Sequence, residues 1–225
     1  MTGPGSPRSP RTSWRNTTHD WAATVDMDHL RHIAGRPAQF APGGVGHLVL
    51  EVLAYAADEA ESRGGGRCVI TLHTDGSVSV ADDGRGTDTR VDEHGRLVKK
   101  PVMATKDLRF FDSPDAERLP DGHPRRGMSV VAALSEWLLH TNRRANGART
   151  QRYEHGVPVS GLVPLPPDGT TGTAVHFIPD ARLRTSACAP TRADLTRADL
   201  TRWVQHWPHL SVRLDDQRTP RADRA

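Results

Sequence analysis

One stretch of the chain carries side chains whose types and spacing could act on a bound ligand. Between residues 47 and 61, His47, Glu51 and Tyr55 recur every four residues, so on a helix they share one stripe. A carboxylate held on such a stripe can serve as a general base, with a histidine one turn away to support it. The plainer alternative is that these residues are the solvated face of an amphipathic helix.

The second stretch is DDGRG, residues 82–86, which follows an alternating segment typical of a β-strand. An ionised Asp82 at the end of a buried strand can accept a hydrogen bond from a ligand in a neighbouring pocket. Gly84 and Gly86 have no Cβ, so they let the backbone approach that ligand closely. The plainer alternative is an ordinary hairpin exit.

Periodic apolar residues predict the elements that must position these groups. Spacing of three and four residues indicates helices, and alternation on either side of turn residues such as Thr74-Asp75-Gly76 and Asn146-Gly147 indicates hairpins. We expect helices over 28–33, 47–61, 127–137 and from near 194, and strands over 68–73, 77–81, 138 to the Asn146-Gly147 turn, from there to 155, 173–178 and 210–214.

The domain organisation follows from composition along the chain. Residues 1–24 are rich in Pro, Ser, Thr and Arg, which predicts a disordered arm, and residues 216–225 are expected to form a disordered tail. Residues 25–215 are long enough for one domain with one core. Within it, residues 87–126 are polar and contain Gly and Pro, which predicts a long, mostly irregular segment of functional importance.

Overall composition limits the class of protein. The sequence has 36% hydrophobic and 25% charged residues, as is usual for a soluble globular protein. A net charge of only +3, with scattered arginines, is weak evidence for a nucleic-acid partner and favours a genomic compositional bias over DNA binding. Cys68 and Cys188 are too far apart to suggest a disulfide framework or a zinc site. No apolar run reaches the roughly 20 residues of a membrane span or forms a signal peptide, so we expect a cytoplasmic protein.

The order of the motifs resembles the N-terminal ATPase domain of DNA gyrase B, which is part of a type IIA topoisomerase and belongs to the GHKL group. The matching features are the helix with Glu51, DDGRG, a long lid, and then GMSVVAALS at 127–135, YEHGVP at 153–158 and TGT at 171–173. The resemblance runs from about residue 29 to 214. It implies an α/β fold, namely a two-layer α/β sandwich of the GHKL (Bergerat) type with a mixed sheet and helices on one face. It also implies that ATP binds between the helices and the sheet.

The resemblance also implies a role for each motif residue. Asp82 corresponds to the residue that reads the adenine amino group, and Thr173 to the threonine that shares the base and a water with it. Glu51 corresponds to the general base, supported by His47. Arg85 corresponds to one half of a charged pair at the mouth of the pocket.

The partner of Arg85 in that pair is Glu59. In the family this part of the pocket also binds aminocoumarin inhibitors. The plainer alternatives are a surface ion pair for Arg85 and Glu59, worth about 0 to 1 kcal/mol, and an ordinary strand threonine at 173.

Two departures from the family concern the phosphates. Tyr55 stands where the family has the asparagine that holds magnesium, and a neutral phenol is a poor magnesium ligand, so magnesium binding is doubtful and no metal site is expected. The family's glycine-rich lid turn is GHPRRG here: Gly122 and Gly127 remain, but Arg125 replaces the middle glycine. Arg125 and its neighbour Arg126 are either phosphate-binding cations or solvated lid residues.

These features predict an ATP-binding domain with weak or no hydrolysis and no strand passage alone, a pseudoenzyme. The alternative is a non-enzymatic interaction or decoy module that binds gyrase, another protein or an aminocoumarin-like ligand. A third possibility is a topoisomerase subunit completed by separate polypeptides. We expect adenine nucleotide and possibly gyrase or topoisomerase subunits as partners, DNA only indirectly, no membrane, and a monomer or weak dimer.

Overall fold

The computed structural model describes residues 25–87, 89–91, 97–99, 102–111, 116–184, 195 and 197–218. Its helices are α1 (Met27–Ala34), α2 (Pro37–Phe40), α3 (Val45–Arg63), α4 (Met128–Ala133), α5 (Ala181–Arg184) and α6 (Arg197–Val204). Its strands are β1 (Gly66–Leu72), β2 (Val78–Asp82), β3 (Thr89–Val91), β4 (Leu97–Lys99), β5 (Ser135–Arg144), β6 (Gly147–Glu154), β7 (Val157–Pro158), β8 (Val163–Leu165), β9 (Gly172–Pro179) and β10 (Leu210–Asp216).

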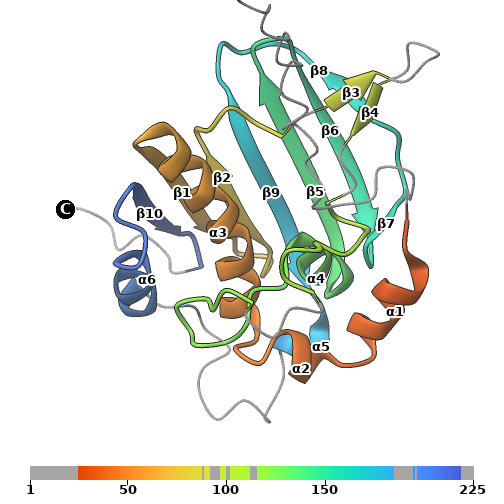
Figure 1. Ribbon diagram of the computed structural model, residues 1–225, viewed down its shortest axis with the longest axis vertical. Helices are drawn as coiled ribbons and strands as arrows, with labels where there is room; N and C mark the ends of the chain where they lie inside the picture. The colour runs from red at the N-terminus through yellow and green to blue at the C-terminus, as the bar shows by residue number, and fades with distance from the viewer. Residues whose placement is uncertain are drawn as a thin grey trace, which may run out of the picture.

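Eight of the strands form one mixed sheet. Their order is β10-β1-β2-β9-β5-β6-β7, with β8 paired to β6, and β3 and β4 form a separate two-stranded sheet. β1 and β10 run parallel, whereas the other neighbours in the large sheet are antiparallel. Figure 1 shows α1, α3 and α4 in front of this sheet. The mixed α/β sandwich that the sequence predicts is confirmed.

Alternating burial along the strands explains which face carries the helices. Ile70 on β1, Val80 on β2, Leu138 on β5 and Phe177 on β9 are all at most 2% exposed, while their sequence neighbours are partly exposed. The buried side chains pack with the apolar face of α3 in one core. The sheet thus has one covered face, and α3 holds its polar stripe next to it.

The boundaries of α3 have simple local causes. The helix ends at Gly64, whose φ of 75° is the left-handed conformation that glycine adopts readily, and the Gly65 N–H caps the carbonyl of Ala60. Gly66 then starts β1, where an added Cβ would lie 2.9 Å from the Ala60 side chain. Helix and strand therefore pack closely, and this fixes the distance between the α3 stripe and the end of β2.

Three predicted boundaries need correction. The helix expected through Trp137 ends at Ala133, and Trp137 lies in β5 opposite Ile178, next to a bulge. Trp137 continues the apolar spacing of the helix by chance, because it belongs to the strand that follows the helix. The helix expected from near residue 194 begins at Arg197. The expected irregular segment 87–126 contains the short strands β3 and β4.

The two terminal predictions have different outcomes. The expected arm, residues 1–24, lies outside the described residues. The expected tail begins too early, because β10 runs to Asp216 and the Gln217 N–H donates to the carbonyl of Leu72; residues 219–225 are not described. Among the helices that the structure describes, none has the length and apolarity to cross a membrane.

Candidate functional site

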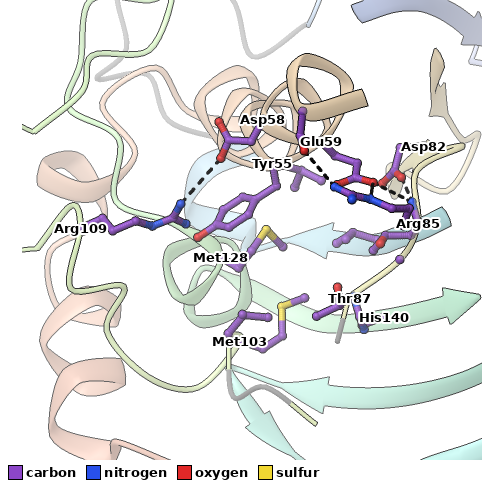
Figure 2. Close-up of a pocket in the computed structure, with 16 residues that line it drawn as sticks. Tyr55, Asp58, Glu59, Asp82, Arg85, Thr87, Met103, Arg109, Met128 and His140 are labelled. Atoms are coloured by element: carbon purple, nitrogen blue, oxygen red, sulfur yellow. Dashed lines mark hydrogen bonds and ion pairs between the residues drawn. The ribbon is translucent and has the colours of Figure 1, made fainter. Parts of the chain in front are cut away.

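A cavity of about 270 Å³ lies between α3 and the sheet. Asp82, Arg85 and Gly86 of DDGRG and Thr173 of TGT line it, so residues predicted from two separate motifs meet in one place. Figure 2 shows the side chains of this cavity, with Asp82 and Arg85 near one end and Arg109 near the other. The volume is slightly below the roughly 300 to 1,000 Å³ typical of small-molecule sites.

Asp82 ends β2 and is held by backbone donors. Its Oδ1 accepts hydrogen bonds from the N–H of Gly84, at 2.8 Å, and of Thr173, at 3.3 Å. Burial raises the pKa of Asp82, and these two hydrogen bonds oppose the rise. Neither bond uses Oδ2, the second oxygen of the carboxylate. Asp82 is thus an oriented acceptor in a site that excludes much of the solvent.

Glycines surround this acceptor because side chains would collide with it. A Cβ on Gly84 would lie 2.7 Å from Oδ1 of Asp82, and one on Gly172 would overlap the carbonyl of Asp82. Gly86 has a φ of 79°, and a Cβ there would lie 2.6 Å from the side-chain oxygen of Asn142. In the structure, the close approach expected from DDGRG is made to Glu59 of α3 at Gly84 and to Asn142 of β5 at Gly86.

Arg85 and Glu59 form the expected charged pair at the rim. Nε and Nη2 of Arg85 donate to the two carboxylate oxygens of Glu59 at 2.7 and 2.9 Å. The Arg85 side chain is 60% exposed and that of Glu59 26%. The hydrogen bonds to Arg85 lower the pKa of Glu59, so both groups are charged at neutral pH.

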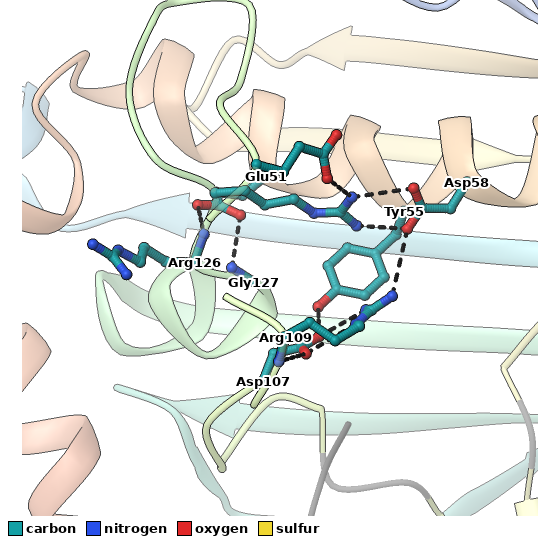
Figure 3. Close-up of polar contacts among 9 residues, drawn as sticks. Glu51, Tyr55, Asp58, Asp107, Arg109, Arg126 and Gly127 are labelled. Atoms are coloured by element: carbon teal, nitrogen blue, oxygen red, sulfur yellow. Dashed lines mark hydrogen bonds and ion pairs between the residues drawn. The ribbon is translucent and has the colours of Figure 1, made fainter. Parts of the chain in front are cut away.

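Glu51 lies outside this cavity, against the end of the lid. Its side chain is fully buried, and its two oxygens accept the backbone N–H groups of Arg126 at 2.6 Å and Gly127 at 2.7 Å. Figure 3 shows the carboxylate between these two donors. The helix stripe therefore is not a solvated face: its glutamate fastens α3 to the start of α4.

His47 extends this connection to another part of the lid. Its Nδ1 lies 2.6 Å from Oδ2 of Asp121, and its Nε2 lies 3.5 Å from Oε1 of Glu51, an ion-pair distance. Burial alone would lower the pKa of His47, but the two carboxylates raise it to about 9. The imidazole is therefore a buried cation between two anions.

Tyr55 belongs to a second polar group at the lid, which also lines the cavity. Its hydroxyl donates to Oδ2 of Asp107 at 2.7 Å, and Arg109 binds the same carboxylate at 2.8 and 3.0 Å. Burial and the Asp107 carboxylate raise the pKa of Tyr55. The hydroxyl is neutral and already directed to an acceptor, which makes it a poor ligand for a metal ion.

Arg125, from the altered lid turn, is almost completely buried beside this group. Its guanidinium binds Asp58 at 2.7 and 3.1 Å and Glu117 at 2.9 Å, and lies 4.7 Å from the ring of Tyr55 (Figure 3). Gly122 has a φ of 85° and open space around it. The predicted contacts of Arg125, Gly122 and Gly127 with phosphate stay predictions.

Sequence reasoning missed the four acidic partners Asp58, Asp107, Glu117 and Asp121. Asp58 is on α3 three residues after Tyr55, so helical spacing could have placed the two side by side. Asp107 and Asp121 lie in the long segment 87–126, which has no periodicity to assign a direction to a side chain. Within the described part of the chain, no group of three or more His, Cys, Asp or Glu residues is arranged to hold a metal ion.

Comparisons with known proteins agree on one relationship. No protein-family model matches the chain. It is 35% identical to the mitochondrial DNA gyrase B of Arabidopsis thaliana over 72% of this chain and 24% of that protein. It is 38% identical to the DNA gyrase B of Thermotoga maritima over 61% of this chain and 22% of that protein.

A third relative is the B subunit of DNA topoisomerase 4 from Bacillus subtilis, 31% identical over 68% of this chain and 24% of that protein. The chain spans about a quarter of the length of these relatives. The chain is therefore a partial homologue of the B subunits of DNA gyrase and DNA topoisomerase 4, with similarity to a region of about a quarter of their length.

Proposed function

We propose that the cavity binds an adenine nucleotide, with ATP as the family's nucleotide, and that Asp82 reads the base. The observation that carries this proposal is the meeting of Asp82 and Thr173 at one cavity, joined by a 3.3 Å hydrogen bond although 91 residues separate them. An oriented, partly desolvated carboxylate suits the exocyclic amino group of adenine, because a charge-assisted hydrogen bond is worth about 1.5 to 3 kcal/mol. The homology to gyrase B supports the same ligand.

Weak or absent hydrolysis is the second part of the proposal. A general base must reach the water that attacks the phosphate, either directly or through one water molecule. Here both oxygens of Glu51 accept backbone N–H groups, the side chain is fully buried, and it does not line the cavity. Hydrolysis through Glu51 would require the end of the lid to move away from α3.

Independence from magnesium is the third part. The hydroxyl of Tyr55 donates a hydrogen bond to Asp107 and its pKa is raised, so it stays a neutral phenol, a poor ligand compared with a carbonyl or carboxylate oxygen. Asp107 itself is bound by Arg109. These donors and acceptors do not fit a hard cation such as Mg²⁺, and we assign no step to one.

Calorimetric titration with a non-hydrolysable ATP analogue tests the proposal, first with magnesium and then with EDTA. We expect binding of equal strength in both, and a reduction in affinity of about tenfold or more in Asp82→Asn. Asp83→Asn is the matched control, because its side chain is exposed and does not line the cavity. Absence of binding to the unmodified protein would refute ATP as the ligand, and clearly stronger binding with magnesium would refute independence from the metal.

A non-enzymatic interaction module is the second candidate function. The bidentate pair of Arg85 and Glu59 at the rim favours it, because the pair offers a planar polar surface to an aminocoumarin-like ligand. Competition between such a ligand and the ATP analogue, together with pull-down of gyrase subunits, tests this candidate. Binding of gyrase subunits in the presence of saturating nucleotide would favour a decoy over a nucleotide-dependent domain.

A topoisomerase subunit completed by other polypeptides stays a third possibility. It predicts that added partner polypeptides produce magnesium-dependent hydrolysis. Failure of any partner to do so would count against it, as would a Tyr55→Asn change that restores turnover in the isolated domain. A cytoplasmic location, an indirect relation to DNA and a monomer or weak dimer also stay predictions.

A further inference from the structure

The part of the cavity beyond the base-reading residues is closed by the protein's own ion pairs. Tyr55 and Arg109 line this part and share the carboxylate of Asp107. Arg125 lies behind them, only 1% exposed, with its guanidinium 4.7 Å from the Tyr55 ring and 4.3 Å from the ring of Phe110. A chain of several phosphates would have to displace this group.

The three arginines Arg85, Arg109 and Arg125, which line the cavity or pack against Tyr55, each have a carboxylate partner. Arg85 binds Glu59, Arg109 binds Asp107, and Arg125 binds Asp58 and Glu117. Among the described residues that line the cavity, the carboxylates Asp58, Glu59 and Asp82 outnumber the guanidinium groups of Arg85 and Arg109 by three to two. A polyphosphate would therefore meet carboxylates and compete with them for each cation, which is unfavourable.

The backbone N–H donors at the start of α4 are also bonded to a carboxylate already. Exposed N–H groups at such a position can bind phosphate. Here the N–H groups of Arg126 and Gly127 donate to Glu51, so the protein supplies its own anion. Among the described residues at this end, neither the side chains of Arg109 and Arg125 nor the backbone at the start of α4 offers a site for a second or third phosphate.

One cation keeps some capacity for a single phosphate. The Arg109 side chain is 41% exposed and lines the cavity, and its Nη1 is 3.9 Å from Asp58, beyond hydrogen-bond distance. An N–H of Nη1 can therefore donate to a ligand while Nε and Nη2 keep their hydrogen bonds to Asp107.

From these contacts we infer that the ligand of this cavity is an adenine nucleoside with at most one phosphate, adenosine or AMP, and that the ion pairs of Arg125 exclude the triphosphate chain. This inference rests on the proposed recognition of adenine by Asp82. The small volume of the cavity, about 270 Å³, agrees with a short ligand.

The test is a comparison of adenosine, AMP and a non-hydrolysable ATP analogue by calorimetry in EDTA. We expect adenosine and AMP to bind at least about tenfold more tightly than the ATP analogue, because the triphosphate chain of the analogue meets carboxylates of like charge. An ATP analogue that binds as tightly as AMP, or tighter, overturns the inference but leaves adenine recognition intact. Failure of all three compounds to bind overturns the proposed function, and the inference with it.

A variant tests the cause of the preference. Asp58→Asn combined with Glu117→Gln removes both counter-charges of the buried Arg125 but leaves amide oxygens that can accept its hydrogen bonds, and a melting curve verifies that the variant is folded. The ATP analogue should gain at least about tenfold in affinity relative to adenosine. Glu61→Gln combined with Glu154→Gln is the charge-matched control, since both residues are exposed and lie outside the cavity lining. An unchanged preference in the first variant, or an equal change in both, overturns the role assigned to Arg125.

Discussion

The backbone N–H of Gly127 donates a 2.7 Å hydrogen bond to Oε2 of Glu51, which is 76 residues earlier in the chain. The neighbouring N–H of Arg126 donates to the other oxygen, Oε1. These two bonds tie the end of the lid to α3 and use both acceptor atoms of the residue that the sequence predicts as a general base. They make Glu51 important for stability, whether or not it also acts on a ligand.

Glu51→Gln should therefore destabilise the folded protein. An amide has one acceptor oxygen, so one of the two N–H groups would face an NH₂ group in a buried place. The free energy of unfolding should fall by about 2 kcal/mol, the usual cost of an unsatisfied buried polar group. Urea denaturation measures it, with Glu61→Gln on the exposed face of α3 as the control. Equal stability of the two variants would show that the bonds to the lid contribute nothing.

The pair formed by His47 and Asp121 makes stability depend on pH. The carboxylates of Asp121 and Glu51 raise the pKa of His47 against the effect of burial, to about 9 from an ordinary 6.5, so the folded protein binds this proton more tightly than the unfolded chain. The resulting stabilisation is complete below pH 6.5 and is lost as the pH rises through 9. The hydrogen bond to His47 lowers the pKa of Asp121 despite burial, so the contribution of Asp121 is lost only in acid.

Urea denaturation between pH 6.5 and 9.5 checks this expectation. The unmodified protein should lose up to about 3 kcal/mol of unfolding free energy over this range, and His47→Gln should lose much less. Asp121→Asn should also flatten the curve, since it removes the 2.6 Å contact. His123→Gln is the control for a neighbouring histidine, since the ring centre of His123 lies 6.0 Å from that of His47. Parallel curves for the protein and His47→Gln would contradict the assignment.

Local sequence patterns predict the sheet and α3 well because the hydrophobic contacts are regular. The alternation of Ile70 and Val80 with exposed neighbours determines the buried face, and Gly64 marks the end of the long helix. The adenine end of the site is predictable for the same reason. Asp82 and Thr173 are at strand ends whose register the pairing of β2 with β9 determines.

The lid end of the site could not be predicted in this way. Asp107 and Asp121 bind Tyr55 and His47 across 52 and 74 residues, from a segment without a regular repeat. A periodic pattern places a side chain on a face, but an irregular loop has no face to assign. The sequence therefore indicated which residues depart from the family, such as Tyr55, and not what they bind.

Asp82→Asn should weaken the binding of adenine compounds without lowering the stability of the fold. Burial raises the pKa of Asp82. At a pH above that raised pKa, the ionised carboxylate therefore destabilises the folded protein when no ligand is bound. An asparagine oxygen can still accept the N–H groups of Gly84 and Thr173, and it carries no charge. The melting temperature of the unliganded variant at pH 7 should therefore equal or exceed that of the unmodified protein, although its affinity for adenine compounds falls. A clear loss of thermal stability would show that the carboxylate has a structural role.

Gly127 and Gly122 allow a last prediction in which backbone strain and steric contact are distinguished. Both have a positive φ, 94° and 85°, so alanine at either position carries a backbone penalty of about 1 kcal/mol or more, and the ψ of −176° at Gly127 is in a region almost restricted to glycine. A Cβ on Gly127 would also lie 2.8 Å from the hydroxyl of Tyr55 and 3.2 Å from Cβ of Asp107, whereas nothing lies within 4 Å at Gly122.

Gly127→Ala should therefore be more destabilising than Gly122→Ala by about 1 to 3 kcal/mol, the usual cost of overpacking. Tyr55 cannot easily move aside, because its hydroxyl is fixed to Asp107. Removing that hydroxyl relieves the clash, so Tyr55→Phe should be less costly in the Gly127→Ala background than in the unmodified protein. Urea denaturation of the four proteins in this double-mutant cycle measures the coupling. Additive effects would mean that Gly127 is required for its conformation alone, and that Tyr55 does not restrict the turn that ends the lid.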